Sequence, residues 1–203
     1  YAHTHGVFNN NFTEFEPEKT PSYPEILREK AGYETAFIGK WHMDETTDDP
    51  RPGFDYWLSF KGQGEYFDPW ININGKRFQQ KGYMTDILTD YSVEWLKKER
   101  NNDKPFCLFV SHKAVHQPFN PAPRHEKLYE DAEILPPPNY YDNLAGKPMW
   151  ARNNELRKKE YVSDDPMIIP DSIVVEPFEP QYFHKDYLRS IVAVDEGVGK
   201  IID

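Results

Sequence analysis

The sequence predicts an α/β fold: a three-layer sandwich in which a mixed, mostly parallel central sheet is flanked by helices. Two apolar runs, at residues 33–39 and 106–110, are short and typical of strands buried on both faces. A helical pattern precedes each run, at residues 22–31 and 85–99. Helix and buried strand therefore alternate along the chain, which is the order that parallel strands require.

The first predicted helix has capping signals at both ends. Ser22 and Glu25 have the spacing of a capping box, and Pro24 suits the first turn. Gly32 suits a C-terminal cap. The first buried strand should therefore begin directly after a defined helix end.

Other elements have shorter signals. Residues 54–60 and 70–78 are strand candidates, and Asn74-Gly75 predicts a hairpin within the second of them. Thr85 or Asp86 is the expected cap of the second helix.

The second half of the chain is less regular. Residues 117–182 hold more than half of the 18 prolines, and a short helix is expected only at residues 124–130. Residues 184–203 predict an amphipathic helix packed on the sheet. Its apolar stripe would consist of Tyr187, Ile191, Val194, Val198 and Ile201.

Composition and charge limit the classes of function. The formal net charge is -10, which argues against nucleic acid and anionic membranes as partners. An anionic substrate would therefore need a local positive site. Aromatic residues make up 15% of the chain, as is typical of folded proteins. No run reaches the ~18 apolar residues of a membrane span, so none is predicted in this segment.

Cys107 is the single cysteine and lies among apolar residues of the second buried strand. It cannot form an internal disulfide, and its position predicts a core residue rather than a nucleophile. The chain starts without an initiator methionine and ends within a predicted helix. We therefore expect an internal piece of a longer protein.

Cationic and titratable side chains follow both buried strands. Lys40 and His42 come directly after the first strand, and His112, Lys113 and His116 come after the second. In α/β sheets, ligands bind outside the carboxyl ends of the strands. If the two strands end at the same edge, these residues form a concentrated positive site.

The residue types at this edge suit the transfer or hydrolysis of a phosphate or sulfate ester. Lysine is a compact charge suited to an oxyanion, and histidine can protonate a leaving oxygen near neutral pH. Lys40 and His42 would share a face of an extended segment, while Pro118 favours a loop that turns His116 inward. The alternative is a solvated loop at each strand end, with Trp41 as a core residue or a pocket lining.

Four segments resemble the type I, formylglycine-dependent sulfatases of the alkaline phosphatase superfamily. The stretch "AGYETAFIGKWHM" is similar to the second sulfatase signature, Gly-Tyr-x-Thr-x-x-x-Gly-Lys-x-His. "HTHGVFNNN" resembles the region shortly after the formylglycine motif. "KPFCLFVSHKAVHQPFNPAPRH" resembles the strand and loop that carry another catalytic histidine, and "YLRSIVAVDEGVGKIID" the helix before the second half of the metal site. The resemblance implies an alkaline-phosphatase-like sandwich of which residues 1–203 are the middle part: an N-terminal catalytic domain truncated at both ends.

The resemblance also implies roles for individual residues. Lys40 matches the lysine that contacts the sulfate and the formylglycine. His42 matches the histidine that hydrogen-bonds the formylglycine hydroxyl and helps to eliminate sulfate. His116 matches the histidine near the leaving oxygen, a candidate general acid and substrate contact. His112 and Lys113 have no firm equivalent and, with Trp41, are expected to bind substrate.

The family nucleophile and metal ligands have no counterpart in this sequence. The motif Cys/Ser-x-Pro-x-Arg is absent, since Cys107 is followed by Leu-Phe-Val-Ser. The formylglycine should therefore derive from a Cys or Ser upstream of Tyr1, made by a maturation enzyme. The Ca²⁺ ligands and a second lysine are likewise expected outside the chain. A polypeptide of these 203 residues alone should not catalyse sulfate ester hydrolysis.

The substrate implied by the resemblance is a sulfated carbohydrate. The region from residue 53 to 96 resembles the glucosamine-6-sulfatase and heparan- or mucin-desulfating branch. N-acetylglucosamine 6-sulfate is therefore the first substrate expected. Tyr66, Phe67 and Trp70 would either stack on sugar faces or pack a small subdomain. By analogy the protein would be exported to the periplasm, cell surface or extracellular space, or to the lysosome in a eukaryote.

Two other functions compete with this interpretation. A phosphodiesterase or phosphonate hydrolase of the same superfamily would use a Thr or Ser nucleophile and two transition metals. A non-catalytic glycan-binding protein would keep the fold without the machinery. Lys40, His42 and His116 argue against the second, because a pure binder needs no proton donor.

Overall fold

The structure is a computed structural model that describes residues 21–43, 46–135, 146, 148 and 180–203, with only the backbone described at 180–184. One compact unit comprises Tyr1–Tyr129 and Asp186–Asp203, and a second comprises Glu130–Lys185. The sequence stretch at residues 3–11 and most of the proline-rich region lie outside the described residues.

The described residues form a five-stranded mixed sheet with the order β4-β3-β2-β1-β5. The strands are β1 (Glu34–Gly39), β2 (Tyr56–Ser59), β3 (Trp70–Ile73), β4 (Lys76–Gln79) and β5 (Phe106–Ser111). β1 pairs in parallel with both β2 and β5, whereas β3 and β4 pair antiparallel. The carboxyl ends of β2, β1 and β5 therefore lie at one edge of the sheet, which confirms the prediction that the two apolar strands end together.

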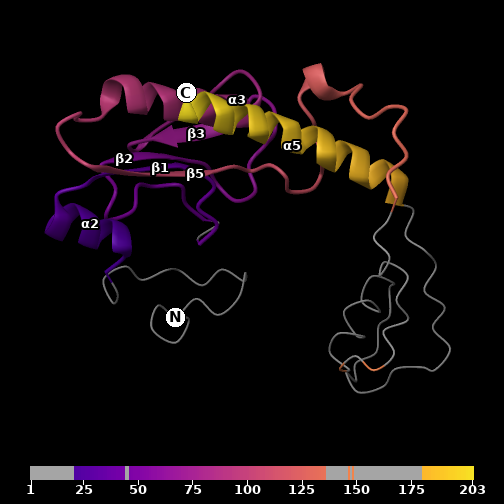
Figure 1. Ribbon diagram of the computed structural model, residues 1–203. Coiled ribbons are helices and arrows are strands. Elements are labelled where there is room, and N and C mark those ends of the chain that lie inside the picture. Colours follow the sequence, from indigo (N-terminus) through magenta and orange to yellow (C-terminus); the bar gives the residue numbers. More distant parts are fainter. Residues whose placement is uncertain (1–20, 44–45, 136–145, 147, 149–179) are drawn as a thin grey trace. The chain divides into compact units, whose positions relative to one another are not determined.

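Helices cover both faces of this sheet (Figure 1). Helix α2 (Tyr23–Ala31) lies on one face, and α3 (Met84–Glu94) and α5 (Pro180–Ile202) lie on the other. The α3 side holds an aliphatic core with Ala36, Ile38, Leu58, Ile71, Met84 and Leu88. The α2 side holds an aromatic cluster of Phe37, Trp41, Phe54, Trp57 and Phe109. The predicted sandwich is therefore confirmed, with two chemically different layers of core.

The caps of α2 form as the sequence predicts. The Ser22 main-chain nitrogen donates to Glu25 Oε2 at 2.6 Å, and the Glu25 nitrogen donates to Ser22 Oγ at 3.5 Å. Gly32 has φ 69, the left-handed conformation that ends helices. These caps direct the chain into β1.

The predicted cap of the next helix is wrong. Helix α3 begins at Met84 after Tyr83, which makes no side-chain capping bond, and Thr85 is buried inside the helix. The Met84 nitrogen instead donates to Tyr66 O at 2.7 Å. Backbone pairing with the preceding loop thus replaces a side-chain cap. The helix continues as a π-helix, Trp95–Glu99.

The helix expected at residues 124–130 is also wrong. Only a 3-10 turn, Pro123–His125, forms there. Its two basic side chains are engaged by α5: Arg124 Nη2 donates to Glu196 Oε2 at 2.6 Å, and His125 Nε2 lies 2.9 Å from Glu196 Oε1. These tertiary contacts, and not helical propensity, set the local conformation.

The buried face of α5 differs from the predicted apolar stripe. Ser190, Ala193 and Gly197 are buried, whereas Ile191 and Val198 are exposed. A Cβ on Gly197 would lie 2.4 Å from Thr89 Oγ1 of α3, so the two helices approach closely. The helix therefore packs on α3 through small residues, and the expectation of an apolar stripe on the sheet is corrected. In the part of the chain that is described, none of the helices has the length and hydrophobicity needed to cross a membrane.

Candidate functional site

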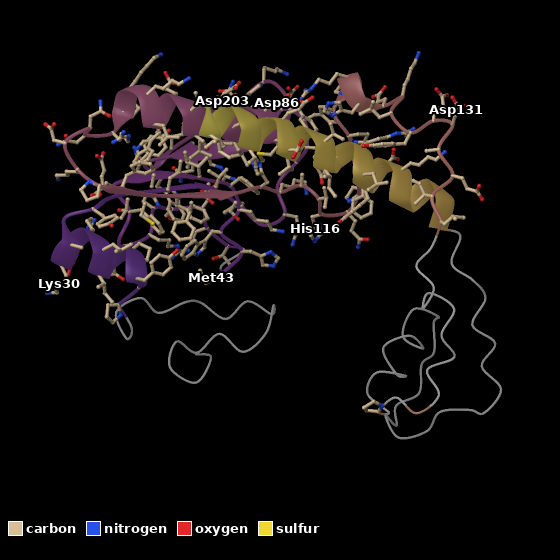
Figure 2. All side chains as sticks on the ribbon, in the orientation of Figure 1. Lys30, Met43, Asp86, His116, Asp131 and Asp203 are labelled. Atoms are coloured by element: carbon tan, nitrogen blue, oxygen red, sulfur yellow. The ribbon has the colours of Figure 1, made fainter. Side chains whose placement is uncertain are left out.

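The candidate site begins where β1 and β5 end side by side. Gly39 pairs with Ser111, and the Lys40 nitrogen donates to Ser111 O at 2.8 Å. Gly39 has φ 132, and a Cβ there would lie 1.9 Å from Ser111 O. Only glycine permits this approach. It places Lys40 beside His112, the residue that follows β5. Figure 2 shows Met43 and His116, from the segments after these strands, toward the same end of the sheet.

The loop after a third strand, β2, contributes Gln63, which was not among the residues predicted from the sequence. β2 ends at Ser59, whose hydroxyl donates to Gly39 O at 2.9 Å. In the loop that follows, Gln63 Oε1 accepts a hydrogen bond from Lys40 Nζ, and Gln63 O accepts one from Lys113 Nζ at 2.9 Å. One glutamine therefore holds the lysines from two different strand ends. The signal was available in "KGQGEYF", a glycine-rich loop directly after a strand candidate.

Lys113 is a buried cation. It is 4% exposed, and its Nζ lies 4.7 Å from the centroid of the Tyr66 ring. Burial lowers the pKa of Lys113, and the nearby charge of Lys40 lowers it further. A carbonyl and an aromatic face stabilise a cation without cancelling its charge. Two positive groups thus lie close together at this edge, an arrangement that favours an anion.

Tyr66 fixes the loop that carries His116. Its hydroxyl donates to His116 O at 2.7 Å, and its ring stacks on Tyr83 with centroids 6.0 Å apart. The His116 nitrogen donates to Lys113 O at 3.0 Å. Burial raises the pKa of Tyr66 far above its usual value, so the hydroxyl remains a donor at any working pH. The described contacts therefore connect Lys40, Lys113 and His116 through Gln63 and Tyr66.

The imidazole of His116 is exposed, and one of its nitrogens has a defined partner. Nδ1 lies 2.6 Å from Gln117 O. Because a carbonyl only accepts, Nδ1 carries the proton of this bond, and Nε2 is the nitrogen that can gain or lose one. The arrangement is suited to a proton donor acting through Nε2.

The remaining predicted site residues lie in different surroundings. His42 is half-buried and has φ 54. Trp41 contacts Phe37 edge-on at 5.2 Å and Trp57 at 5.4 Å, so it belongs to the aromatic core cluster. Burial lowers the pKa of His112, and its ring nitrogens have no hydrogen-bond partner among the described residues. Substrate contacts of Trp41 and His112 stay predictions.

The aromatic residues considered as sugar platforms divide into two groups. Tyr66 is 3% exposed and packs beneath Lys113, so packing accounts for it. Phe67 and Trp70 are 43% and 52% exposed. Only these two have free faces on which a sugar could stack.

The described residues contain no group of three or more His, Cys, Asp or Glu that could hold a metal ion. In the acidic loop, Asp48 is instead a buried structural residue. Its Oδ1 accepts from Asn72 Nδ2 at 3.2 Å, and its Oδ2 lies 3.4 Å from Arg77 Nε. The part of the chain that the structure describes therefore does not fit a calcium site.

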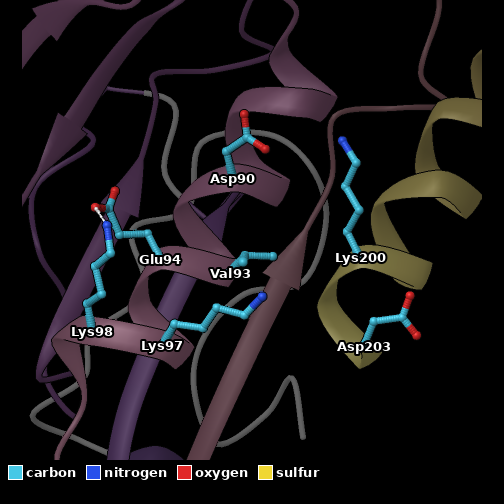
Figure 3. Close-up of a pocket in the computed structure, with 7 residues that line it drawn as sticks. All are labelled: Asp90, Val93, Glu94, Lys97, Lys98, Lys200 and Asp203. Carbon is cyan, nitrogen blue, oxygen red and sulfur yellow. Dashed lines mark hydrogen bonds and ion pairs between the residues drawn. The ribbon is translucent and has the colours of Figure 1, made fainter.

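A groove of about 550 Å³ lies away from this edge, between α3 and the end of α5 (Figure 3). Its lining carries charges of both signs, and Lys98 pairs with Glu94 at 3.4 Å. The lining residues are Asp90, Val93, Glu94, Lys97, Lys98, Lys200 and Asp203. None of them is a candidate residue of the site at the strand ends.

Cationic and imidazole groups at the carboxyl ends of the parallel strands of an α/β sandwich form an arrangement that suits the binding of a tetrahedral anion. The sulfatase family model matches residues 1–203, and the chain belongs to the sulfatase family.

Named relatives agree with this membership. An N-acetylglucosamine-6-O-sulfatase from Bacteroides thetaiotaomicron is 35% identical over 168 residues, covering 81% of this chain and 29% of the relative. An extracellular sulfatase homologue from Drosophila melanogaster is 30% identical over 152 residues, covering 69% of this chain and 14% of the relative. The chain therefore spans less than a third of each of these relatives.

A solved structure shows the same fold. The protein BT4656, in complex with its substrate D-glucosamine-2-N,6-O-disulfate, matches with a TM-score of 0.76 and 28% identity. The match covers 100% of this chain and 49% of that protein. The fold of this chain thus matches about half of that structure.

Proposed function

We propose that the complete protein hydrolyses sulfate monoesters on sulfated glycans. The observation that carries this proposal is the pair of ammonium groups, Lys40 and Lys113, held on Gln63 beside the loop of His116. A sulfate group offers several oxygens to such a pair, and the net charge of -10 for the whole chain makes this local positive site unusual. Membership of the sulfatase family supports the same conclusion.

N-acetylglucosamine 6-sulfate, or a related glucosamine 6-sulfate, is the proposed substrate. The bacterial relative at 35% identity is named an N-acetylglucosamine-6-O-sulfatase. The solved neighbour binds a glucosamine that carries a 6-O-sulfate. The exposed faces of Phe67 and Trp70 offer stacking surfaces for further sugars of a glycan.

The proposed mechanism assigns one task to each of four residues. Lys40 binds the sulfate oxygens and opposes the charge that develops on them. His116, protonated at Nε2, donates to the departing sugar oxygen. His42 moves a proton during release of sulfate from the enzyme. Lys113 adds positive charge without direct solvent screening, because it is buried.

The family chemistry needs two groups that we place outside this chain. A formylglycine, formed by a maturation enzyme from an upstream Cys or Ser, supplies the nucleophile, and Ca²⁺ supplies further positive charge for the sulfate. The sequence contains no Cys/Ser-x-Pro-x-Arg motif, and the described residues do not form a metal site. A polypeptide of these 203 residues is therefore expected to release no sulfate.

The complete protein is proposed to be exported to the compartment in which sulfated glycans are found. Sulfated glycans of the glucosamine type are polar polymers that lie outside the cell or in degradative compartments. The Drosophila relative is named an extracellular sulfatase.

The direct test is sulfate release by the complete protein from a panel of sulfated sugars. We expect turnover of N-acetylglucosamine 6-sulfate, and loss of turnover after treatment with a calcium chelator that added Ca²⁺ reverses. Matching phosphate esters serve as the control, and they should react far more slowly. Preferential hydrolysis of phosphate diesters, or no hydrolysis with tight glycan binding, would instead support one of the two competing functions.

A further inference from the structure

Gln63 makes two different hydrogen bonds to two lysines. Its side-chain oxygen accepts from Lys40 Nζ, and its main-chain oxygen accepts from Lys113 Nζ. Lys40 follows β1 and Lys113 follows β5, while Gln63 lies on the loop after β2. Gln63, which follows β2, therefore connects the lysines that follow β1 and β5.

The loop holds Gln63 in place independently of its side chain. Gly64 has φ 63, and a Cβ there would lie 2.5 Å from the ring of Phe60. Phe60 is 3% exposed and belongs to the core cluster beneath α3. The main-chain oxygen of Gln63 is bound to Lys113, so the backbone from Gln63 to Gly64 is fixed by two contacts. A change of the side chain alone should leave the loop folded.

The chemistry of the amide suits the positioning of a catalytic cation. A lysine side chain has four rotatable bonds and loses rotamer entropy when it is fixed. An accepting oxygen restricts the ammonium group before the substrate arrives. Because glutamine is neutral, its hydrogen bond does not oppose the charge of Lys40, whereas a carboxylate at this position would form an ion pair that competes with sulfate.

We propose that Gln63 is a positioning residue of the sulfate site, which fixes the ammonium of Lys40 for contact with the sulfate oxygens. This inference rests on the proposed function and names a residue through which that site is organised. Gln63 acts through Lys40, so its contribution should vanish when the ammonium is removed. That dependence separates positioning from a general structural role.

The test is a double-mutant cycle in the complete protein, with inorganic sulfate as the probe. The four proteins are wild type, Gln63→Leu, Lys40→Met and the double variant, and the affinity for sulfate is measured by calorimetry. We expect Gln63→Leu to weaken sulfate binding about tenfold, as the loss of one bond to a charged group does. In the Lys40→Met background the same change should alter binding less than twofold.

A charged variant and a remote control complete the design. Gln63→Glu keeps the shape and the accepting oxygen, so it should fold as wild type does, yet weaken sulfate binding more than Gln63→Leu. Gln79→Leu, on the exposed face of β4, should bind sulfate as wild type does. For N-acetylglucosamine 6-sulfate, Gln63→Leu should lower kcat and raise KM together.

Three results would overturn the proposal. They are an equal effect of Gln63→Leu in both backgrounds, unchanged sulfate affinity in Gln63→Glu, and sulfate binding that does not depend on Lys40. Failure of the proposed function gives a different result. The wild type would then bind sulfate through Lys40 and respond to Gln63 variants, but would not hydrolyse any sulfated sugar.

Discussion

At the scale of single residues, the atoms that hold His116 in place differ from the atom proposed to transfer a proton. His116 is attached through its main chain, which bonds to Tyr66 and Lys113, while its ring nitrogen Nδ1 is bonded to Gln117 O. The second ring nitrogen, Nε2, is available for proton transfer. Such anchoring would hold the proposed proton donor in position and leave its reactive atom accessible.

Replacing His116 tests this assignment. His116→Ala in the complete protein should lower kcat for a sulfated sugar by about 10²–10⁴, the usual contribution of a positioned acid. The fall should be much smaller for an aryl sulfate, whose leaving group needs no proton. Steady-state kinetics with both substrates provide the comparison. An unchanged rate on the sugar, or equal losses on both substrates, would remove His116 from the role of general acid.

The sequence predicted some of these residues and not others. Lys40, His42, His112, Lys113 and His116 are visible because they directly follow apolar strands. Gln63 was not singled out, although its glycine-rich loop follows a strand candidate, and Tyr66 was considered only as a sugar platform or a packing residue. An amide and a phenol in such a loop are common in any protein. Their roles depend on which side chains lie opposite, and only the sheet order supplies that information.

At the scale of elements, α5 is held by close packing on α3 and by a charged contact. Gly197 allows the approach to Thr89, and Glu196 accepts bonds from Arg124 and His125. Arg124 also donates to Asp86 of α3 at 2.7 and 2.8 Å. The apolar stripe read from the sequence was wrong here because small residues, which carry little hydrophobic signal, make the closest helix contact.

Two glycines of α5 offer a matched comparison. A Cβ at Gly197 would lie 2.4 Å from the Thr89 hydroxyl, which is itself bonded to Thr85 O at 2.8 Å, whereas a Cβ at Gly199 meets nothing within 4 Å. Gly197→Ala should therefore destabilise the protein by about 1–3 kcal/mol through overpacking. Gly199→Ala should stabilise it by about 0.5–1 kcal/mol, because alanine is the better helix former. Urea unfolding measures both changes, and the same sign for the two variants would refute the proposed packing.

The charged contact predicts a pH dependence. Hydrogen bonding to Arg124 lowers the pKa of Glu196 below its ordinary value of 4.5. A lowered pKa in the folded state means that the stabilisation is present above the unfolded value and is lost as the pH falls through the folded value. Because Glu196 is 40% exposed, this contribution should be at most about 1 kcal/mol.

Glu196→Gln should therefore reduce stability at pH 7, and its difference from wild type should shrink below about pH 4. Unfolding midpoints between pH 7 and pH 3 provide the measurement. Glu94→Gln, which breaks the exposed pair with Lys98, is the control and should have little effect at any pH. A stability difference for Glu196→Gln that grows toward low pH would contradict the assigned direction.

At the scale of the molecule, the sheet brings distant segments of the chain to one edge. Lys40, Gln63 and Lys113 follow β1, β2 and β5, three parallel neighbours in the sheet. The alternation of helix and apolar strand was enough to predict that β1 and β5 end at the same edge, because buried parallel strands have a distinct sequence pattern. It did not predict the place of β2. The pattern could not supply the position of α5 or the turn at residues 123–125, because both depend on contacts between segments far apart in the sequence.

The central claim is that Lys40, His42 and His116 surround one tetrahedral anion. A crystal structure of the complete protein with a bound sulfated sugar tests it most directly. We expect Lys40 Nζ within hydrogen-bond distance of a sulfate oxygen, and His116 Nε2 at similar distance from the bridging oxygen. We also expect the His42 ring beside the group that attacks sulfur. A sulfate bound elsewhere, with these three side chains not sharing it, would contradict the account.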